Sequence, residues 1–420
     1  MDESIAILGR QPTLGLAELE SLYGGANVEL VNSQVARLQV SPCYIDFPRL
    51  GGTIKLCKTL KVIDTTDLKQ IETFLASVSP SYSERMPKGK MHLGLSAYGL
   101  ETTPQQLHAI GIHIKKVISE KHKRSVRIVP NNSLELNAAQ VLHNKLLTDN
   151  GWELALVRHE NQTIIAQTMF IQGIESYSLR DYGRPKRDSR VGMLPPKLAQ
   201  IILNLAIGPD EFTAIKPTIS NDNCLRPEDN QKIDAQRSLK TLLDPFCGTG
   251  VVLQEALLAG YRTKGTDLNP RMIEYAKENL RWLVDRYKPR SKIYDLAIGD
   301  ATNYQWSLPV DIVVSETYLG RPFTTQPSRE VLEQTIADCD LIIKKFLRNI
   351  FQQLPSSTRL CLAVPAWQVR PRQFRHLPVI DQLSDLGYNR LRFKHAQNED
   401  LLYYRPDQIV ARELLVLARS

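Results

Sequence analysis

The sequence lacks the marks of an exported, membrane-bound or metal-binding protein. Its six cysteines contain no CxxC pair and its eight histidines are scattered, so neither a zinc site nor a disulfide framework is expected. Residues 1–11 carry acids where a signal peptide carries bases. No stretch approaches the roughly 20 apolar residues of a membrane helix. We therefore expect no bound metal, no membrane association and a reducing, cytoplasmic location.

Low-complexity tracts are also absent, which excludes a disordered chain. With 42% hydrophobic and 23% charged residues, the 420-residue chain has the composition of a folded protein. At about 150 residues per domain, this length suggests roughly three units. The net charge of +8 and the pI near 9.0 favour a polyanionic partner, but solubility alone explains them equally well.

The first part of the chain reads as two α+β modules. A strand is expected at residues 5–8, followed by a helix whose apolar stripe ends at Gly24 and Gly25. After a polar stretch at residues 79–90 the pattern restarts with a strand at 92–98 and a helix opened by Thr103. We therefore expect one domain at residues 1–80 and a second at 81–178.

Residues 179–200 read as a linker that leads into the second half. The run RDYGRPKRDSR at 180–190 combines proline and glycine with basic residues, among them Arg180, Arg184, Lys186 and Arg187. Such a segment is either a solvated connector or a grip for a nucleic-acid backbone, and the sequence leaves both open.

Residues 201–420 have the pattern of a parallel-sheet α/β domain. Residues 208–237 are polar and read as a loop, and from 241 onward strand and helix patterns alternate. The last strand-like runs, at 391–394, 401–404 and 409–417, suggest an antiparallel hairpin at the sheet edge. The expected fold class is α/β, with a Rossmann-like C-terminal domain behind α+β modules.

A glycine loop follows the first strand of this domain. The run DPFCGTG should lie at the strand's carboxyl end, where open α/β sheets bind ligands. Leu253 stands where a dinucleotide fingerprint has its third glycine, and Asp244 would repel a pyrophosphate but accept hydrogen bonds from an ammonium group. The loop residues expected to bind a cofactor are Asp244, Phe246, Gly248, Thr249 and Gly250.

Two further acids follow later strands of the same domain. Asp267 ends the next strand at the spacing that places an acid against ribose hydroxyls, with Asn269 beside it. Asp300 follows the strand after that, where it can receive an adenine amino group. Taken singly, each is as well explained as a turn or helix-cap residue, so the weight rests on their order along the chain.

At these residues the chain resembles class I S-adenosyl-L-methionine-dependent methyltransferases, in the DPFCGTG form of RNA and DNA amino-methylating enzymes. The segment at 180–200 and the run LGRQPTLGLAELESLY near the start resemble THUMP-domain tRNA guanosine methyltransferases. The resemblance implies a ferredoxin-like domain, a THUMP module that grips tRNA, and a Rossmann-like catalytic domain. It also implies S-adenosyl-L-methionine as cofactor and the 2-amino group of a tRNA guanosine as methyl acceptor.

The catalytic motif departs from that family. Where the family has Asp-Pro-Pro-Tyr, this chain has Ser315, Glu316, Thr317 and Tyr318, without either proline. We expect Glu316 to accept a hydrogen bond from the target amine, Tyr318 to stack on the base, and Ser315 to complete the catalytic group. The altered loop also supports an alternative, an RNA-binding pseudo-methyltransferase that has lost transfer. A DNA or protein methyltransferase is a third, weaker interpretation.

Basic residues gather at the end of the second module's first helix. We expect Lys115, Lys116, Lys121, Lys123 and Arg124 either to contact RNA phosphates or simply to stabilise the helix C-terminus. In the α/β half, Arg370, Arg372, Arg375 and His376 alternate with Trp367 and Phe374, which suggests core or lid packing more than a base-binding loop. Arg390, Arg392 and Lys394 read as a solvated face. An activating subunit is left open.

Overall fold

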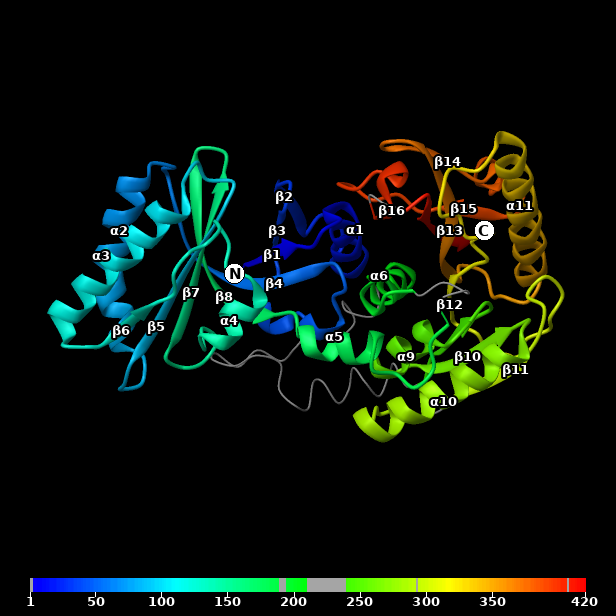
Figure 1. Ribbon diagram of the computed structural model, residues 1–420, viewed down its shortest axis with the longest axis horizontal. Coiled ribbons are helices and arrows are strands. Elements are labelled where there is room, and N and C mark those ends of the chain that lie inside the picture. Colours follow the sequence, from blue (N-terminus) through cyan, green and yellow to red (C-terminus); the bar gives the residue numbers. More distant parts are fainter. Residues whose placement is uncertain (1–2, 189–193, 210–238, 292–293, 406–407) are drawn as a thin grey trace. The chain divides into compact units, whose positions relative to one another are not determined.

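The computed structural model in Figure 1 describes residues 3–188, 194–209, 239–291, 294–405 and 408–420. The polar loop expected at residues 208–237 falls almost wholly outside this part of the chain. The chain forms two compact units: Met1–Pro12, Ala26–Pro48 and Thr53–Glu175 make the first, and Thr13–Gly25, Arg49–Gly52 and Ser176–Ser420 make the second. Among the described residues, no helix is both long and apolar enough to cross a membrane.

The first unit is built on one mixed sheet of eight strands in the order β2-β3-β1-β4-β8-β7-β5-β6. Strand β5 runs parallel to β6 and β7, whereas the other neighbours are antiparallel. The strands are β1 (Ser4–Leu8), β2 (Val28–Asn32), β3 (Val35–Leu38), β4 (Thr53–Ile63), β5 (Met91–Tyr98), β6 (Val126–Ile128), β7 (Gly151–His159) and β8 (Gln162–Ile171).

This sheet runs across the boundary expected near residue 80. Strand β4, from before it, pairs with β8, from after it, and residues 79–84 continue helix α2 (Leu68–Glu84) instead of forming a linker. Within this helix Ser79 and Ser83 are buried and donate their hydroxyls to the carbonyl oxygens of Leu75 and Pro80, so their polar groups have partners. The division into domains at 1–80 and 81–178 stays a prediction.

Helices α2 and α3 (Pro104–His122) lie side by side on one face of the sheet (Figure 1). Helix α3 begins at Thr103 as the sequence predicts, and a capping box forms there, in which Thr103 and Gln106 each bind the other's backbone N–H. Its buried residues Leu107, Ile110 and Ile114 pack into the same apolar cluster as Leu93 of β5. The 3-10 turns Pro42–Tyr44 and Phe47–Arg49 and the short helix α4 (Ala138–His143) complete the connections.

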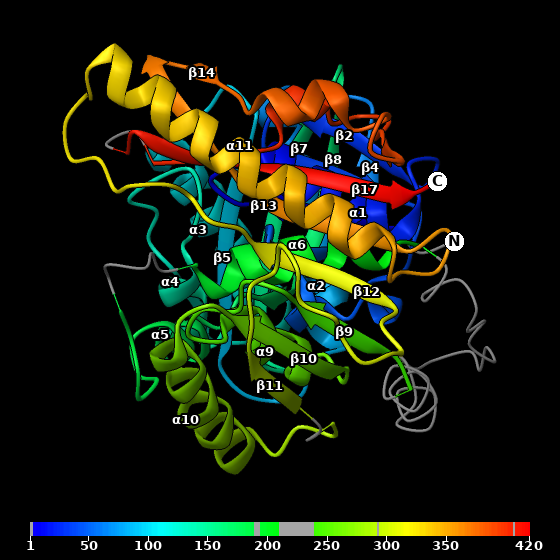
Figure 2. The same ribbon diagram turned by 90° about the vertical axis from the view of Figure 1, so that its right-hand side faces the viewer.

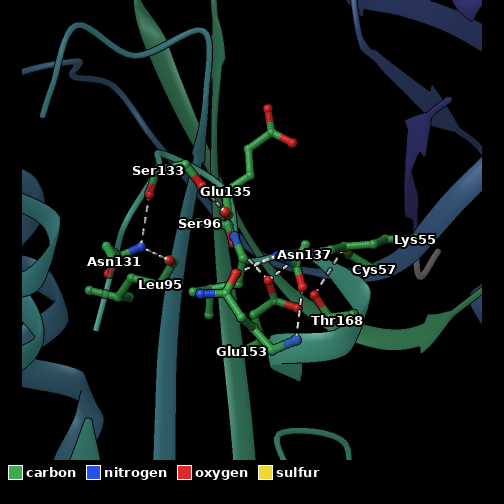
Figure 3. A network of polar contacts seen from close by, with 12 residues as sticks. Lys55, Cys57, Leu95, Ser96, Asn131, Ser133, Glu135, Asn137, Glu153 and Thr168 are labelled. Carbon is green, nitrogen blue, oxygen red and sulfur yellow. Dashed lines mark hydrogen bonds and ion pairs between the residues drawn. The ribbon is translucent and has the colours of Figure 1, made fainter. Parts of the chain in front are cut away.

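A buried polar network joins β4, β5 and β7 in this unit (Figure 3). Lys55 Nζ lies 2.5 Å from Glu153 Oε1, which also accepts a hydrogen bond of 2.7 Å from Ser96 Oγ. Ser96 in turn accepts the backbone N–H of Leu136. The network therefore pairs two buried charges and fixes the segment before α4 on the sheet.

The second unit contains a nine-stranded sheet in the order β11-β10-β9-β12-β13-β17-β15, with β14 on β13 and β16 on β17. The five strands from β11 to β13 are parallel, and the rest are antiparallel. The strands are β9 (Thr241–Asp244), β10 (Arg262–Asp267), β11 (Tyr294–Ile298), β12 (Ile312–Glu316), β13 (Arg359–Arg370), β14 (Gln373–Arg375), β15 (Tyr388–Arg390), β16 (Leu402–Tyr403) and β17 (Val410–Arg419).

The closing hairpin is only partly as expected. Strands β16 and β17 pair antiparallel, but β17 is not an edge strand because it lies between β13 and β15. Residues 391–394 form no strand. The continuous apolar run of β17 explains its place, since Leu414 and Val416 face one layer of core while Leu415 and Leu417 face the other.

Helices cover both faces of this sheet, α11 on one side and α6 on the other (Figure 1), and Figure 2 shows α11 lying along β13 and β17. The helices are α5 (Ile174–Asp181), α6 (Pro196–Ile207), α9 (Val251–Leu258), α10 (Pro270–Tyr287) and α11 (Arg329–Phe351), with 3-10 turns at Pro378–Gln382 and Asn398–Asp400. The α/β fold class is therefore confirmed, with two layers of helices around one sheet.

Most of α1 (Pro12–Tyr23) belongs to the second unit, although it lies near the start of the chain. Glu18 is buried and accepts hydrogen bonds from the N–H groups of Gly51 and Gly52 and from Asn204 of α6. Glu20 accepts the N–H groups of Lys394 and His395. The α/β unit thus needs residues 13–25 and 49–52, which a domain limited to residues 201–420 leaves out.

Four described cysteines, Cys57, Cys247, Cys339 and Cys361, are free and buried. Cys43 is disulfide-bonded, although the sequence predicts no disulfide framework.

Candidate active site

A pocket of about 780 Å³ opens at the carboxyl ends of β9, β10 and β12. It brings together most of the residues predicted for the cofactor and the reaction. The predicted residues on its wall are Asp244, Phe246, Gly248, Thr249, Asp267, Asp300, Glu316 and Tyr318. Gly250, Asn269 and Ser315 do not line the pocket.

The glycine loop turns sharply between β9 and α9. Gly248 (φ 51°) and Gly250 (φ 84°) both have left-handed backbone, which explains glycine at these two positions. A Cβ on Gly250 would lie 3.2 Å from Ala276 of α10, whereas a Cβ on Gly248 would meet no atom within 4 Å. Gly250 therefore allows close packing of the loop on α10, and Gly248 leaves open space on the pocket side.

Asp267 binds the loop from the end of β10. One carboxylate oxygen accepts the N–H of Gly248 at 2.9 Å, and the other accepts the N–H of Asn269 at 2.8 Å. Asn269 caps α10 by accepting the N–H of Arg271, which is the helix-cap role weighed against a cofactor contact. Burial raises the pKa of Asp267. The carboxylate lines the pocket and keeps lone pairs for further donors.

Asp244 is the deepest acid of the site. It is 1% exposed and accepts Ser315 Oγ at 2.6 Å and the N–H of Phe246 at 3.2 Å. Burial raises its pKa to about 8, although both hydrogen bonds lower it. A buried carboxyl group on a pocket wall is a suitable partner for a cationic ligand group, which would favour its ionised form.

Asp300 lies after β11 at the far end of the same wall, beside Ala301 and Thr302. Its carboxylate accepts the N–H of Thr302 at 2.9 Å, a turn contact, while the side chain still faces the pocket. Asp300 can therefore stabilise the turn and still accept a hydrogen bond from a ligand in the pocket.

The loop after β12 lacks prolines but is fixed by other contacts. Thr317 donates its N–H to the carbonyl oxygen of Ala363 at 3.0 Å. Gly320 has φ 81°, and a Cβ there would lie 2.8 Å from Thr335 and 3.2 Å from Cys339 of α11. Ser315, where the family has aspartate, is fully buried and donates to Asp244 instead of facing the pocket. Direct contact between Ser315 and a target base is therefore not supported.

Glu316 and Tyr318 remain at the pocket. Tyr318 is 44% exposed, as an aromatic ring that meets an incoming base must be. The Glu316 carboxylate forms an ion pair with Arg412 Nε of β17. Arg412 was not predicted from the sequence. The two adjacent charged residues Arg412 and Glu413 inside the apolar strand β17 were a sign that this position has a buried polar partner.

Helix α11 supplies a further wall that the sequence analysis missed. Its residues Asp338, Leu341, Ile342 and Lys345 line the pocket, and Leu341 is 53% exposed. Exposed leucine on an otherwise amphipathic helix is a weak signal in a sequence.

Two linker arginines are buried, whereas both interpretations of this segment, a solvated connector and a grip for a nucleic-acid backbone, place its cations at the surface. Arg180 forms an ion pair of 2.7 Å with Glu255 of α9 and lies over the ring of Tyr177. Arg184 is 3% exposed, and burial lowers its pKa. Because buried guanidinium groups cannot reach a phosphate, neither arginine remains a candidate for RNA contact in this conformation.

The rest of the linker is attached to the cofactor loop. Asn279 of α10 accepts the N–H of Lys186 and donates to the carbonyl oxygens of Lys186 and Thr249, at 3.0 and 2.9 Å. Lys186 Nζ lies 3.4 Å from Glu278, and Arg187 is exposed and lies over the Tyr182 ring. These two cations stay candidates for RNA contact.

The basic cluster of the first unit is divided in the same way. Lys115, Lys116, Lys121 and Lys123 are exposed, so a phosphate could reach them. Arg124 donates to the carbonyl oxygens of Ser83, Pro87 and Gly89 and to Asn150. Arg124 therefore holds this turn together and is a structural residue.

The basic, aromatic segment after β13 packs as the simpler interpretation predicts. Trp367 is fully buried, and Phe374 stacks at a tilt on Tyr404 with ring centroids 5.0 Å apart. Arg390 is not on a solvated face, because it pairs with buried Glu413 at 3.0 Å. His376 binds the same carboxylate, and this hydrogen bond raises the pKa of His376.

The chain is similar to known proteins over part of its length. No family model matches the chain. The chain is 30% identical over 126 residues to the tRNA (guanine(10)-N2)-dimethyltransferase of Methanothermobacter thermautotrophicus, and 30% identical over 137 residues to the protein of that name from Pyrococcus abyssi. These matches cover 30% and 32% of this chain. They span about a third of each relative, 32% and 36% of its length.

The fold also matches a solved structure over its whole length. TrmN from Thermus thermophilus superposes with a TM-score of 0.51 at 14% sequence identity, covering 100% of both chains. At this identity the match supports the α/β architecture alone.

Proposed function

We propose that this protein is an S-adenosyl-L-methionine-dependent RNA methyltransferase that modifies the exocyclic 2-amino group of a guanosine in tRNA. The observation that best supports this proposal is that one pocket is lined by five of the predicted residues, Asp244, Asp267, Asp300, Glu316 and Tyr318. The two relatives named tRNA (guanine(10)-N2)-dimethyltransferases support the substrate class.

The donor set fits S-adenosyl-L-methionine better than a dinucleotide. Asp244 is suited to the methionine ammonium group and Asp267 to the ribose hydroxyls, whereas the Asp267 carboxylate beside the loop would repel a pyrophosphate. Asp300, at the far end of the wall, is suited to the adenine amino group. The open space at Gly248 admits a ligand close to the backbone.

When bound, S-adenosyl-L-methionine supplies a methyl group activated by its sulfonium. The residues of this chain need to orient the acceptor and exclude water, and little acid–base chemistry is required. Glu316 would accept a hydrogen bond from the target amine and so direct its lone pair. Tyr318 would stack on the base and hold it in the pocket.

The exposed lysines at the end of α3, together with Lys186 and Arg187, would hold the tRNA backbone. This assigns tRNA as the partner and the first unit as the RNA-binding module.

The test is transfer of a labelled methyl group to total tRNA, followed by mass spectrometry of the nucleosides. We expect methylated guanosine with the wild-type protein and much less with Asp267→Ala when S-adenosyl-L-methionine is limiting. Absence of label with both proteins would overturn the assignment.

A second function has one observation in its favour. Ser315 replaces the family's aspartate and bonds Asp244, which suits an RNA-binding pseudo-methyltransferase. That protein would bind cofactor and tRNA and transfer nothing.

A further inference from the structure

Glu316 and Arg412 meet although their strands are not neighbours. Strand β13 lies between β12 and β17, and Glu316 is opposite Ala363 while Arg412 is opposite Pro365. Since Ala363 and Pro365 are two residues apart, all four side chains lie on the same face of the sheet. The pairing register thus sets Glu316 and Arg412 diagonally across one strand.

The residues between them are small enough to allow this contact. Strands lie about 4.8 Å apart, so two steps separate the backbones of β12 and β17 by roughly 10 Å. A glutamate and an arginine side chain together span that distance over Ala363 and Pro365. The Glu316 and Arg412 side chains are only 14% and 9% exposed. An ion pair this sheltered keeps a defined geometry, unlike an exposed one.

We infer that Arg412 is a positioning residue that holds the Glu316 carboxylate in place for the target amine. This inference rests on the proposed methyltransferase function. Arg412 Nε engages Oε1 of the carboxylate, and within the described part of the chain Oε2 accepts no hydrogen bond. Oε2 is therefore the acceptor for an amine in the pocket that Glu316 lines.

This contact replaces the rigidity that the family obtains from two prolines. Prolines fix the backbone of the loop through their φ angles. Here the backbone is held by Thr317 and Gly320, and the acceptor itself is fixed by a guanidinium group from another strand. Arg412 is not among the residues that line the pocket, so we expect its effect to act through Glu316.

The experiment is a double-mutant cycle of Arg412→Met and Glu316→Gln, read by steady-state methyl transfer to tRNA. We expect Arg412→Met to lower kcat about tenfold or more, with KM for tRNA and Kd for S-adenosylhomocysteine changed less than about threefold. The double variant should be no slower than the slower single variant, because both remove the same interaction. Additive effects would show an independent, structural role and overturn the inference.

Two further variants keep the test decisive. Arg390→Met removes an ion pair from the opposite face of β17 and should lower thermal stability while leaving kcat unchanged. Should Arg412→Met fail to fold, Arg412→Lys keeps the charge without the planar Nε donor, and its kcat should fall severalfold. If the wild type is active and kcat does not change in the Arg412 variants, the positioning role is wrong and the proposed function still stands. A wild type that binds cofactor and tRNA but transfers nothing overturns the proposed function and this role together.

Discussion

Ser315 Oγ donates a hydrogen bond of 2.6 Å to Asp244 Oδ1. This bond joins the strand that carries the altered catalytic loop to the strand that carries the glycine loop, since Ser315 belongs to β12 and Asp244 ends β9. Ser315 therefore contacts the side of the pocket that carries the glycine loop. Because the bond favours the carboxylate form of Asp244, the two loops are coupled by charge as well as by packing.

Cofactor binding should depend on pH through Asp244. Its pKa is about 8, so below that pH the group must lose a proton before it can pair with an ammonium group. Affinity for S-adenosylhomocysteine should fall as the pH drops below about 8, by up to about tenfold per unit. Calorimetry measures it, with Asp244→Asn as reference because the ligand's own amino group also titrates. If the affinity changes equally with pH in the wild type and in Asp244→Asn, Asp244 is not the partner of the ligand's ammonium group.

The same raised pKa has a consequence for stability. A carboxyl group whose pKa rises on folding destabilises the protein progressively as the pH climbs from its unfolded value of 3.8 to about 8. Asp244→Asn should therefore raise the unfolding midpoint more at pH 8 than at pH 5, as measured by thermal denaturation.

Ser315→Ala removes the hydrogen bond that favours the carboxylate form of Asp244, so it should weaken cofactor binding at neutral pH.

The Asp267 carboxylate should decide which nucleotide binds. Asp267→Ala should weaken S-adenosyl-L-methionine binding about tenfold to a hundredfold, the scale expected when hydrogen bonds to a charged group are removed. NAD should bind the wild type far more weakly than S-adenosyl-L-methionine does, since its pyrophosphate would face the Asp267 carboxylate. Comparable calorimetric affinities for NAD and S-adenosyl-L-methionine in the wild type would refute the cofactor assignment.

The α/β unit should not fold without its N-terminal pieces. A fragment of residues 190–420 lacks α1 and residues 49–52, and we expect it to lose the cooperative thermal transition of the whole chain. In the full protein, Glu18→Ala leaves three buried donors without their acceptor, each costing about 1–3 kcal/mol. Glu18→Gln, which keeps one acceptor oxygen, should be less destabilised. Wild-type stability of Glu18→Ala would show that this anchor is dispensable.

RNA affinity should separate the two kinds of basic residue at the end of α3. Changing Lys115, Lys116 and Lys121 to Gln should weaken tRNA binding and lower the slope of log K against log salt by about 0.7–0.9 for each phosphate that is no longer neutralised. Arg124→Gln should instead lower the unfolding midpoint, because Arg124 holds three carbonyl groups. A filter-binding salt series and thermal denaturation check both. An unchanged slope in the triple variant would place the RNA elsewhere.

Tyr318 should act through its ring. Tyr318→Phe keeps the stacking surface and should leave transfer nearly unchanged, whereas Tyr318→Ala should weaken base binding by roughly 1–3 kcal/mol. Single-turnover rates at varied tRNA concentration separate this effect from any change in the chemical step. If the phenylalanine variant is as defective as the alanine variant, the hydroxyl and not the ring carries the role.

The sequence by itself determined the local elements and the order of the three acids that line the pocket. The alternating apolar residues of β5, the helix start at Thr103 and the glycine loop depend on neighbouring residues in the chain, so a linear pattern records them. The three acids also followed from local order, because parallel strands end at one edge of a sheet and bring whatever follows them together.

Only the tertiary structure decided how distant segments share a core. Nothing local shows that β4 pairs with β8, that α1 belongs to the α/β unit, or that Arg180 and Arg184 are buried. The contact between Glu316 and Arg412 depends on the register of three strands, and shifting one strand by a single residue would put the two charges on opposite faces. Such pairings are set by the summed burial of whole faces, which no single stretch of sequence contains.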